Sequence, residues 1–480
     1  MKPISFYLFG FLFLSILLPV SAQLDTFDLS KYKLPDIKRR QLDVNLSAAF
    51  TQQRDNSAEL KNFSGNGSFS PRLSTYTNTS KYQGSGIFSL SINPFFAGWS
   101  TLGAPNLTES KSSSFSGDIS YSSTNRFFFV NKLFIETDLS GSFYNSTTNS
   151  ESTMNDAGGN FNSRTKQDQA SLQAYVDASL IFGKGRIEPV EDARLAVYIL
   201  QDLQKLNKLT RIPSQDEILE FSSLISTLKN KRFFDARLHK IEELTEIDHF
   251  LHEKGLVKDN DIAYFNAVND NWDYSSGPLR STGSKFYAGI NPFLSLFTNL
   301  SHTTDFDSLQ VQIGYLKTQT SNPSIQLGYL AGYEYNKPIK LCWQLKFGAV
   351  ISFYSEYLTN TDIVNSVTTR NHNTYVNPRE FASIGYYPNS RTFYTAGINL
   401  NQTFIVIHSW YSNINEWQKT SQMNNYTASL ALNFYYYISP QIRLNGSWNL
   451  DSGLKSDKMT SQNRNNFNQR INAGLIYSIF

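Results

Sequence analysis

The stretch INAGLIYSIF, residues 471–480, has the pattern of one amphipathic strand. Side chains along a strand point alternately to its two faces. One face therefore carries only apolar and aromatic side chains, namely Ile471, Ala473, Leu475, Tyr477 and Ile479. The opposite face carries Asn472, Gly474 and Ser478. One side of this strand suits hydrocarbon and the other suits water.

The same alternation recurs along the chain. It is clearest in residues 169–182, where Leu172, Val176 and Leu180 alternate with Gln173, Asp177 and Ser179, and it returns in 129–143 and 341–353. Residues 426–438 and 442–450 form a predicted hairpin with a tight turn. The aromatic content of 14% suits interfacial girdles. We therefore expect an all-β transmembrane antiparallel β-barrel of about 14–16 strands, even in number.

The N-terminal residues 1–22 have the pattern of a cleavable signal peptide: Lys2, an apolar run, and the small pair Ser21 and Ala22. No later stretch reaches the roughly 20 apolar residues of a spanning helix. The single cysteine, Cys342, excludes an intramolecular disulfide. The net charge of +3 over 480 residues gives no reason to expect nucleic acid as a partner.

Residues 184–267 break the strand pattern. Apolar residues recur there with a helical period after Pro189, and a second helix is signalled by Ser214 with Glu217, a capping box. A third helix is predicted to end at Gly255. Charged residues rise to roughly one in three, which places the exposed faces of these helices in water. The sequence thus predicts a helical insert, either periplasmic or folded up as a plug.

The resulting domain prediction has five parts. The signal peptide (1–22) precedes a polar periplasmic lead-in (23–40), a first part of the barrel (41–183), the helical insert (184–267) and a second part of the barrel (268–480). Residues 269–276 are included as an extra, weakly patterned strand. The long polar stretches 96–112, 145–164, 356–374, 412–424 and 452–466 are expected as external connections.

Two resemblances support this organisation. Asn472, Gly474, Tyr477, Ile479 and the terminal Phe480 resemble the C-terminal assembly signal of bacterial outer-membrane β-barrels. The stretches FDLSKYKLPD (27–36) and GKGRIEPVEDARLAVYIL (183–200) resemble uncharacterised outer-membrane β-barrel proteins of the Bacteroidota. The resemblance implies a multi-pass protein of a Gram-negative outer membrane, with lipid and the barrel-assembly machinery as partners. It brings no catalytic, cofactor or metal motif.

The candidate functional residues are charges expected to face the lumen: Lys132, Glu136, Asp138, Asp177, Lys346 and Arg443. Such charges can select what passes through a barrel, or they can pair across strands and fill its interior. The pair His249 and His252 could bind a metal with Glu246 or Glu253, but no further ligand stands at a recognisable spacing, which favours two solvated histidines.

Three functions remain open. The first is a pore or transport protein whose lumen is gated or plugged by the insert. The second is a non-enzymatic component of an outer-membrane assembly or secretion machine, with residues 184–267 docking a periplasmic or outer-membrane protein. The third, a hydrolase using His408 and Ser409, is disfavoured because adjacent strand residues point to opposite faces. We therefore expect no enzyme and no cofactor.

Overall fold

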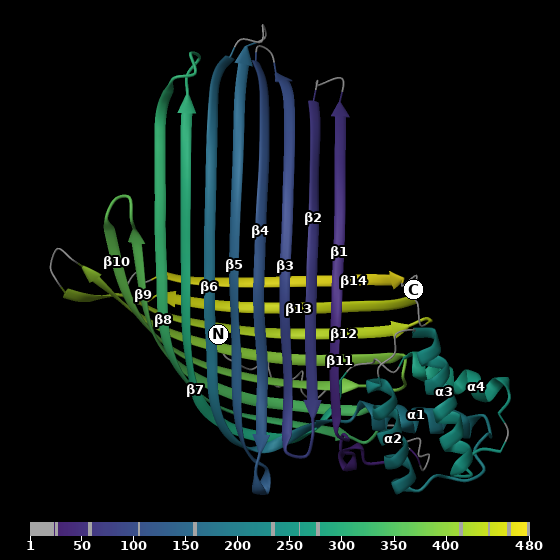
Figure 1. The fold of residues 1–480 in the computed structure, drawn as a ribbon. Helices are drawn as coiled ribbons and strands as arrows, with labels where there is room; N and C mark the ends of the chain where they lie inside the picture. The colour runs from purple at the N-terminus through teal and green to yellow at the C-terminus, as the bar shows by residue number, and fades with distance from the viewer. Residues whose placement is uncertain are drawn as a thin grey trace.

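The computed structural model describes residues 24, 27–55, 60–103, 106–156, 161–231, 236–258, 260–274, 279–411, 416–439, 442–457 and 462–477. Within these ranges the chain forms one large sheet and one group of helices (Figure 1). The helices lie at one end of the strands, which we call the module end. The expectation of a mainly β chain interrupted once by helices is confirmed.

The sheet contains 14 strands in sequence order, and every neighbouring pair is antiparallel. This is the up-and-down order of a barrel wall, and the number is even, as expected. The strands are β1 (Ile37–Asp55), β2 (Leu60–Asn78), β3 (Tyr82–Gly103), β4 (Asn106–Phe128), β5 (Leu133–Asp156), β6 (Phe161–Pro189), β7 (Ser281–Phe306), β8 (Gln312–Ile339), β9 (Trp343–Asp362), β10 (Val367–Tyr386), β11 (Thr392–Tyr411), β12 (Glu416–Tyr437), β13 (Ile442–Asp457) and β14 (Gln462–Tyr477).

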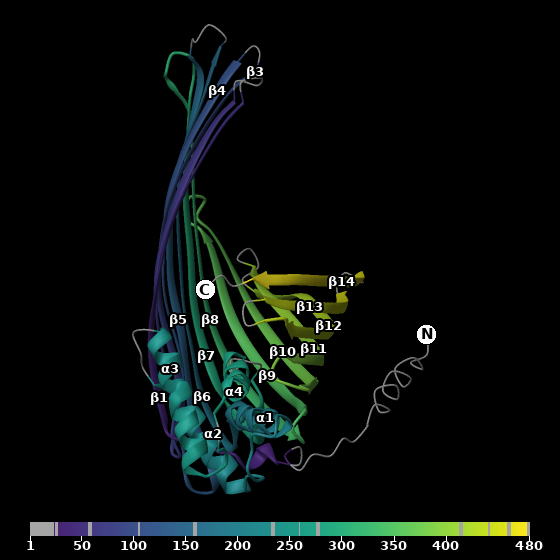
Figure 2. The same ribbon diagram turned by 90° about the vertical axis from the view of Figure 1, so that its right-hand side faces the viewer.

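The sheet is open. Among the described strands no ladder joins β1 to β14. Figure 1 shows the long strands β1–β8 upright and β11–β14 turned across them, and the side view in Figure 2 shows β14 well away from β1. The right-handed twist that accumulates from strand to strand produces such a curl. The strand order of a barrel is thus present, whereas the closed cylinder expected from the sequence is not.

The two faces of the sheet differ in chemistry. On β9 the apolar side chains Phe347 and Ile351 are 39% and 52% exposed, whereas Ser352 beside them is 8% exposed on the other face. Register carries this apolar face across the sheet: Ile351 lies opposite Ala331 of β8, and Trp448 of β13 lies opposite Ile471 of β14. The alternation predicted for residues 341–353 is present from Trp343 onward, and that predicted for the last strand is present over 471–476, but Leu341 is wrong: it lies in the turn before β9 and is buried in the core of the helices. We call the two sides the apolar face and the polar face.

The strands are longer than their alternating segments. On β5 the apolar face carries Leu133, Ile135, Leu139 and Phe143, but residues 145–153 are polar on both faces and still pair with β6. The prediction that 145–164 and similar polar stretches form external connections is therefore wrong for most of their length. Alternation thus stops partway along β5, although the backbone ladder continues.

The helical module comprises α1 (Glu191–Lys205), α2 (Gln215–Asn230), α3 (Ala236–Glu253) and α4 (Ile262–Asp273). Its boundaries differ from the predicted 184–267, because residues 184–189 extend β6 against the start of β7, and residues 268–273 complete α4. The strand expected at 269–276 is therefore wrong in its described part. Likewise, β1 begins at Ile37, inside the predicted lead-in.

The module has the main apolar core of the molecule. Ala196, Ile199 and Leu203 of α1 are fully buried against α2 and α4, together with Leu29 and Tyr32 of the N-terminal segment. A short 3-10 turn, η2 (Leu29–Lys31), holds that segment in place. None of the described helices is long and apolar enough to cross a membrane.

The predicted helix caps are confirmed. Ser214 Oγ accepts from the backbone N–H of Glu217 at 3.3 Å, and the Glu217 carboxylate accepts from the Ser214 N–H at 2.8 Å. Hydrogen bonds from Arg211 lower the pKa of Glu217 to about 2. Gly255 ends α3 with a φ of 62°, a conformation that glycine adopts without steric cost.

We expect Glu217→Ala to lower the stability of the helical module by about 1 kcal/mol at neutral pH, because the cap at α2 is lost. The folded-state pKa of Glu217 lies below its ordinary 4.5, so its contribution is complete above pH 4.5 and disappears as the pH falls through about 2. Thermal unfolding followed by helical circular dichroism of the full chain measures both effects. Thr227→Ala, on the exposed side of α2, is the matched control; an equal loss for both variants would contradict the prediction.

Candidate functional site

The candidate residues are distributed along the polar face. Register places Asp138 of β5 opposite Ser179 of β6, and Asp177 opposite Ser140, all on that face. Glu136, Lys346 and Arg443 occupy the same face on β5, β9 and β13 by strand parity. The prediction for Lys132 is wrong: it lies in the turn before β5, with a φ of 58° and an exposed side chain.

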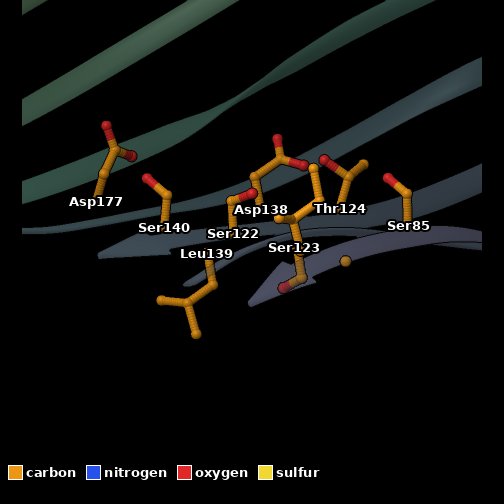
Figure 3. Close-up of a pocket in the computed structure, with 10 residues that line it drawn as sticks. Ser85, Ser122, Ser123, Thr124, Asp138, Leu139, Ser140 and Asp177 are labelled. Atoms are coloured by element: carbon orange, nitrogen blue, oxygen red, sulfur yellow. The ribbon is translucent and has the colours of Figure 1, made fainter. Parts of the chain in front are cut away.

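Asp138 and Asp177 line a shallow hollow of about 160 Å³ across β3–β6. Figure 3 shows the oxygens of Ser85, Ser140 and these two aspartates directed to the same side, whereas Leu139 points away. Asp177 accepts a 2.6 Å hydrogen bond from the Asn291 side chain, which also contacts Ser179. The hollow is thus rich in hydroxyl and carboxylate groups, which suits polar solutes.

Other charges on the polar face form ion pairs. Glu136 forms an ion pair with Arg126 across β4 and β5. Glu334 of β8 lies between Lys346 at 3.4 Å and Lys285 at 3.7 Å. For these residues the structure shows the pairing that was expected as the alternative. Arg126 and Glu136 balance each other, whereas one carboxylate, Glu334, is shared by two lysines and leaves one positive charge.

A second, larger hollow of about 460 Å³ lies on the polar face of β9–β11, beside Tyr287 of β7. Its lining includes Lys346, Arg379, Phe381 and Asn399. Arg379 was not among the predicted residues. Strict alternation along β10 puts Tyr386 on one face and Ser383, Phe381 and Arg379 on the other, the polar face. Pro378 and Glu380, on either side of Arg379, obscure this pattern in the sequence.

A buried arginine, at the point where the chain returns from the helices to β7, binds the β8–β9 connection at the module end. Arg280, 1% exposed, donates to the backbone carbonyls of Leu341 and of Trp343, the latter at 2.7 Å. Its guanidinium stacks 5.0 Å from the ring centroid of Tyr387. Burial, aided by the nearby Arg194 charge, lowers the pKa of Arg280 to about 10, so it remains charged at neutral pH.

Further contacts extend this attachment. Tyr198 of α1 donates a 2.5 Å hydrogen bond to the Tyr387 carbonyl, and burial raises the pKa of its hydroxyl. Arg391 pairs with Asp270 of α4 at 2.7 Å, and Tyr274 packs edge-on against Tyr437. The module therefore contacts the connections β8–β9 and β10–β11 and the end of β12.

A second arginine organises the other part of this end. Arg186 of β6 donates to the carbonyls of Ser80 and Thr79 at 2.9 and 3.0 Å, and it pairs with Glu188. Gly185 precedes it with a φ of 118°, and the ideal Cβ position there is 2.0 Å from the Ser284 carbonyl. Residues 183–189 thus form part of the edge of the sheet at the module end, which we call the rim. Sequence reasoning noted the motif but missed both arginines.

The histidines predicted as a possible metal pair face carboxylates of the same helix. His249 pairs with Glu253 at 3.7 Å and His252 with Asp248 at 3.2 Å, each within α3. No group of three metal-ligating side chains is present in the described part of the chain. In β11, Ser409 contacts Asn371 at 2.8 Å while His408 stacks near His372, so the two adjacent residues do face apart.

The described part of the C-terminal signal lies in β14. Asn472 donates to Ser447 at 3.2 Å on the polar face, and Gly474 lies opposite Asn445. Tyr477 lies opposite Ile442 in the register. Ile479 and Phe480 lie outside the described residues.

No family model matches the chain, and no curated protein matches it. Among solved structures it is similar to the CymD monoaromatic hydrocarbon channel, with 9% identity, a TM-score of 0.28 and coverage of 96% of this chain and 94% of that chain. It is also similar to a mutant of the TodX monoaromatic hydrocarbon channel, with 10% identity, a TM-score of 0.25 and coverage of 94% of this chain and 92% of that chain. A third similar structure is the translocator domain of the autotransporter NalP from Neisseria meningitidis, with 8% identity, a TM-score of 0.21 and coverage of 92% of this chain and 88% of that chain. At these TM-scores the likeness carries no inference.

We expect Arg280→Met to destabilise the attachment of the module by about 2–4 kcal/mol, because buried carbonyls lose a charged donor. Hydrogen exchange of α1 and of residues 340–342 in the detergent-solubilised full chain measures this. Arg391→Gln, which breaks the more exposed pair with Asp270, is the control and costs at most about 1 kcal/mol. Equal, small effects of the two variants would show that Arg280 does not hold the module.

Proposed function

We propose that the chain is a pore or transport protein of a Gram-negative outer membrane, related to the Bacteroidota barrels it resembles, with the helical module covering one mouth of its lumen. The observation that carries this proposal is the exposed apolar face shared by all 14 strands. On β5 that face runs over residues 133–143. This matches the roughly 9–11 residues that a tilted strand needs to span hydrocarbon.

Closure of the sheet follows from the same pattern. The apolar face continues to both free edges, with Leu42, Val44 and Leu46 on β1 and Ile471 and Leu475 on β14 all exposed. With an even strand number, β1 and β14 run antiparallel and can pair. Unpaired backbone groups cannot remain in hydrocarbon, where each costs several kcal/mol. Pairing of β1 with β14 satisfies both edges and encloses the polar face.

The module would then lie across the mouth of the barrel. It contacts β1 through α2 at one free edge, and Tyr274 contacts Tyr437 near the other edge. The described connections at this end are short, apart from the module itself, and β14 also ends there. These features support a periplasmic orientation of the module end, as in outer-membrane barrels.

One observation favours the second candidate function, in which the module docks a partner protein. Ile241 of α3 and Ile262 and Phe265 of α4 remain exposed on the module, Ile262 at 88%. Exposed apolar groups on a water-soluble module suit a docking surface. A pull-down from solubilised membranes with the parent and Ile262→Ser separates the two: a stoichiometric partner lost in the variant favours docking, and conductance without a partner favours transport.

Closure predicts a disulfide between the two edge strands. In a Cys342→Ser background, Val44→Cys combined in turn with a cysteine at Gln469, Ile471 or Ala473 should form a crosslink in at least one combination, because all four positions share the apolar face. Electrophoresis without reductant detects it. Cysteines at Asp43 and Ile471, which face opposite sides, are the control. If no same-face pair crosslinks in folded protein, the barrel does not close at this seam.

Transport predicts ion conductance across planar bilayers by the purified full chain, because a closed wall of this strand number encloses a wet lumen. Arg280→Met should increase the conductance or its fluctuations, since the module is released from the rim. Arg391→Gln again serves as the control. A folded protein that conducts in neither form would overturn the transport proposal.

A substitution at Glu380 tests whether the apolar face of β10 lies in the bilayer. It is an exposed carboxylate on the apolar face of β10, opposite Ala349 and Leu400, midway between the ring of Tyr386 and the stacked pair Tyr357 and His372. Glu380→Leu should stabilise the protein in lipid vesicles by about 1–2 kcal/mol, because a lipid-facing carboxylate is unfavourable. Guanidinium titration measures this. Glu356→Leu on the polar face should be destabilising, since Asn373, Tyr375 and Ser324 lose their acceptor.

A further inference from the structure

We propose that the hollow on β9–β11 is a binding site for a small carboxylate with a hydroxylated ring, the chemistry of a sugar acid. This inference rests on the proposed transport function and adds a solute class to it. Three strands supply the groups: Lys346 lies opposite Ser383, Val350 opposite Arg379, and Phe381 opposite Asn399. Cations, hydroxyl and amide donors and an aromatic ring thus line one cavity of about 460 Å³. That volume falls in the usual range of small-molecule sites.

The positive charge here is not neutralised. Glu334 is shared by Lys285 and Lys346, so one carboxylate faces two ammonium groups. Arg379 has no hydrogen bond or ion pair to any residue that the structure describes, and its side chain is exposed on the hollow. Arg126, by contrast, is paired with Glu136 on the same face. An unpaired guanidinium in a hollow is suited to bidentate binding of a carboxylate.

The floor of the hollow is shaped by glycine and an aromatic ring. The Phe381 ring lies over Gly348, where the ideal Cβ position is 2.6 Å from the ring. Lys346 Nζ is 5.5 Å from the centroid of the same ring, on the β9 side. At Gly397 the nearest atom to an added Cβ is the Ser383 Cβ at 3.5 Å, an ordinary contact. The Gly397 side of the floor is therefore free for a ligand.

The chemistry of the ligand follows from this arrangement. Arg379 and Lys346 would bind a carboxylate, Ser383 and Asn399 would bind hydroxyls, and the Phe381 ring would contact the C–H face of a sugar ring. A neutral sugar would lose the carboxylate contact. An inorganic anion would lose the contacts to the ring and the amide. The site therefore distinguishes glucuronate from both glucose and chloride.

Binding is tested with glucuronate as the probe, by calorimetry on the folded full chain in detergent, with glucose as the comparison. We expect saturable glucuronate binding, weakened about 10-fold or more in Arg379→Gln, because a charge-assisted hydrogen bond is lost. Gly397→Val, which fills the floor and keeps every charge, should weaken it as well. Glu380→Gln, next to Arg379 on the opposite face, should not.

Arg443→Gln provides the second control, since Arg443 is a polar-face arginine outside the hollow. Equal losses in Arg379→Gln and Arg443→Gln would reduce the effect to general attraction of anions and overturn the site. Absence of saturable glucuronate binding to the parent, or equal binding of glucose, would also overturn it. Calorimetry does not depend on conductance, so a protein that binds but does not conduct would refute only the transport function, and a conducting protein that does not bind would refute only the site.

Discussion

The alternation of side chains along paired strands is the constraint on which the rest of the structure depends. Along its alternating segment every strand presents one apolar and one polar face, and register keeps the same faces aligned from β1 to β14. A slip of one residue in any ladder would exchange those faces. Because the apolar groups are exposed and do not form a core, this sheet gains nothing from burying them against other parts of the chain. An apolar surrounding would cover the exposed apolar side chains, and pairing of β1 with β14 would satisfy the two free edges.

Stabilisation by a buried apolar core is concentrated in the helical module. Its core includes residues from the N-terminal segment and Leu341 from the β8–β9 connection, so distant parts of the sequence meet there. Arg280 joins this core to the sheet through backbone carbonyls. The module end of the sheet is thus ordered by packing and buried hydrogen bonds, whereas at the opposite end the strands are held by their backbone ladders.

The strand identities, the helical module and its caps could be predicted because they depend on local signals. Alternation reveals β6 at residues 169–182, and Ser214 with Glu217 marks the start of α2. The polar extensions could not be predicted, since 145–153 pair with β6 without an apolar face. Of the candidate site, Asp138, Asp177 and Lys346 followed from parity. Arg379 and Arg280 did not, because their roles depend on which strands and connections lie beside them.

The attachment of the module within one hairpin has a consequence for how such a chain can change over evolutionary time. The backbone leaves β6 at Val190 and returns at Arg280, and these two residues share a hydrogen bond of 2.9 Å. The segment between them therefore begins and ends at a single point of the wall. Exchange of that whole segment for another, longer or shorter, would leave the register of β6 and β7 intact. The rim can diversify while the wall is conserved.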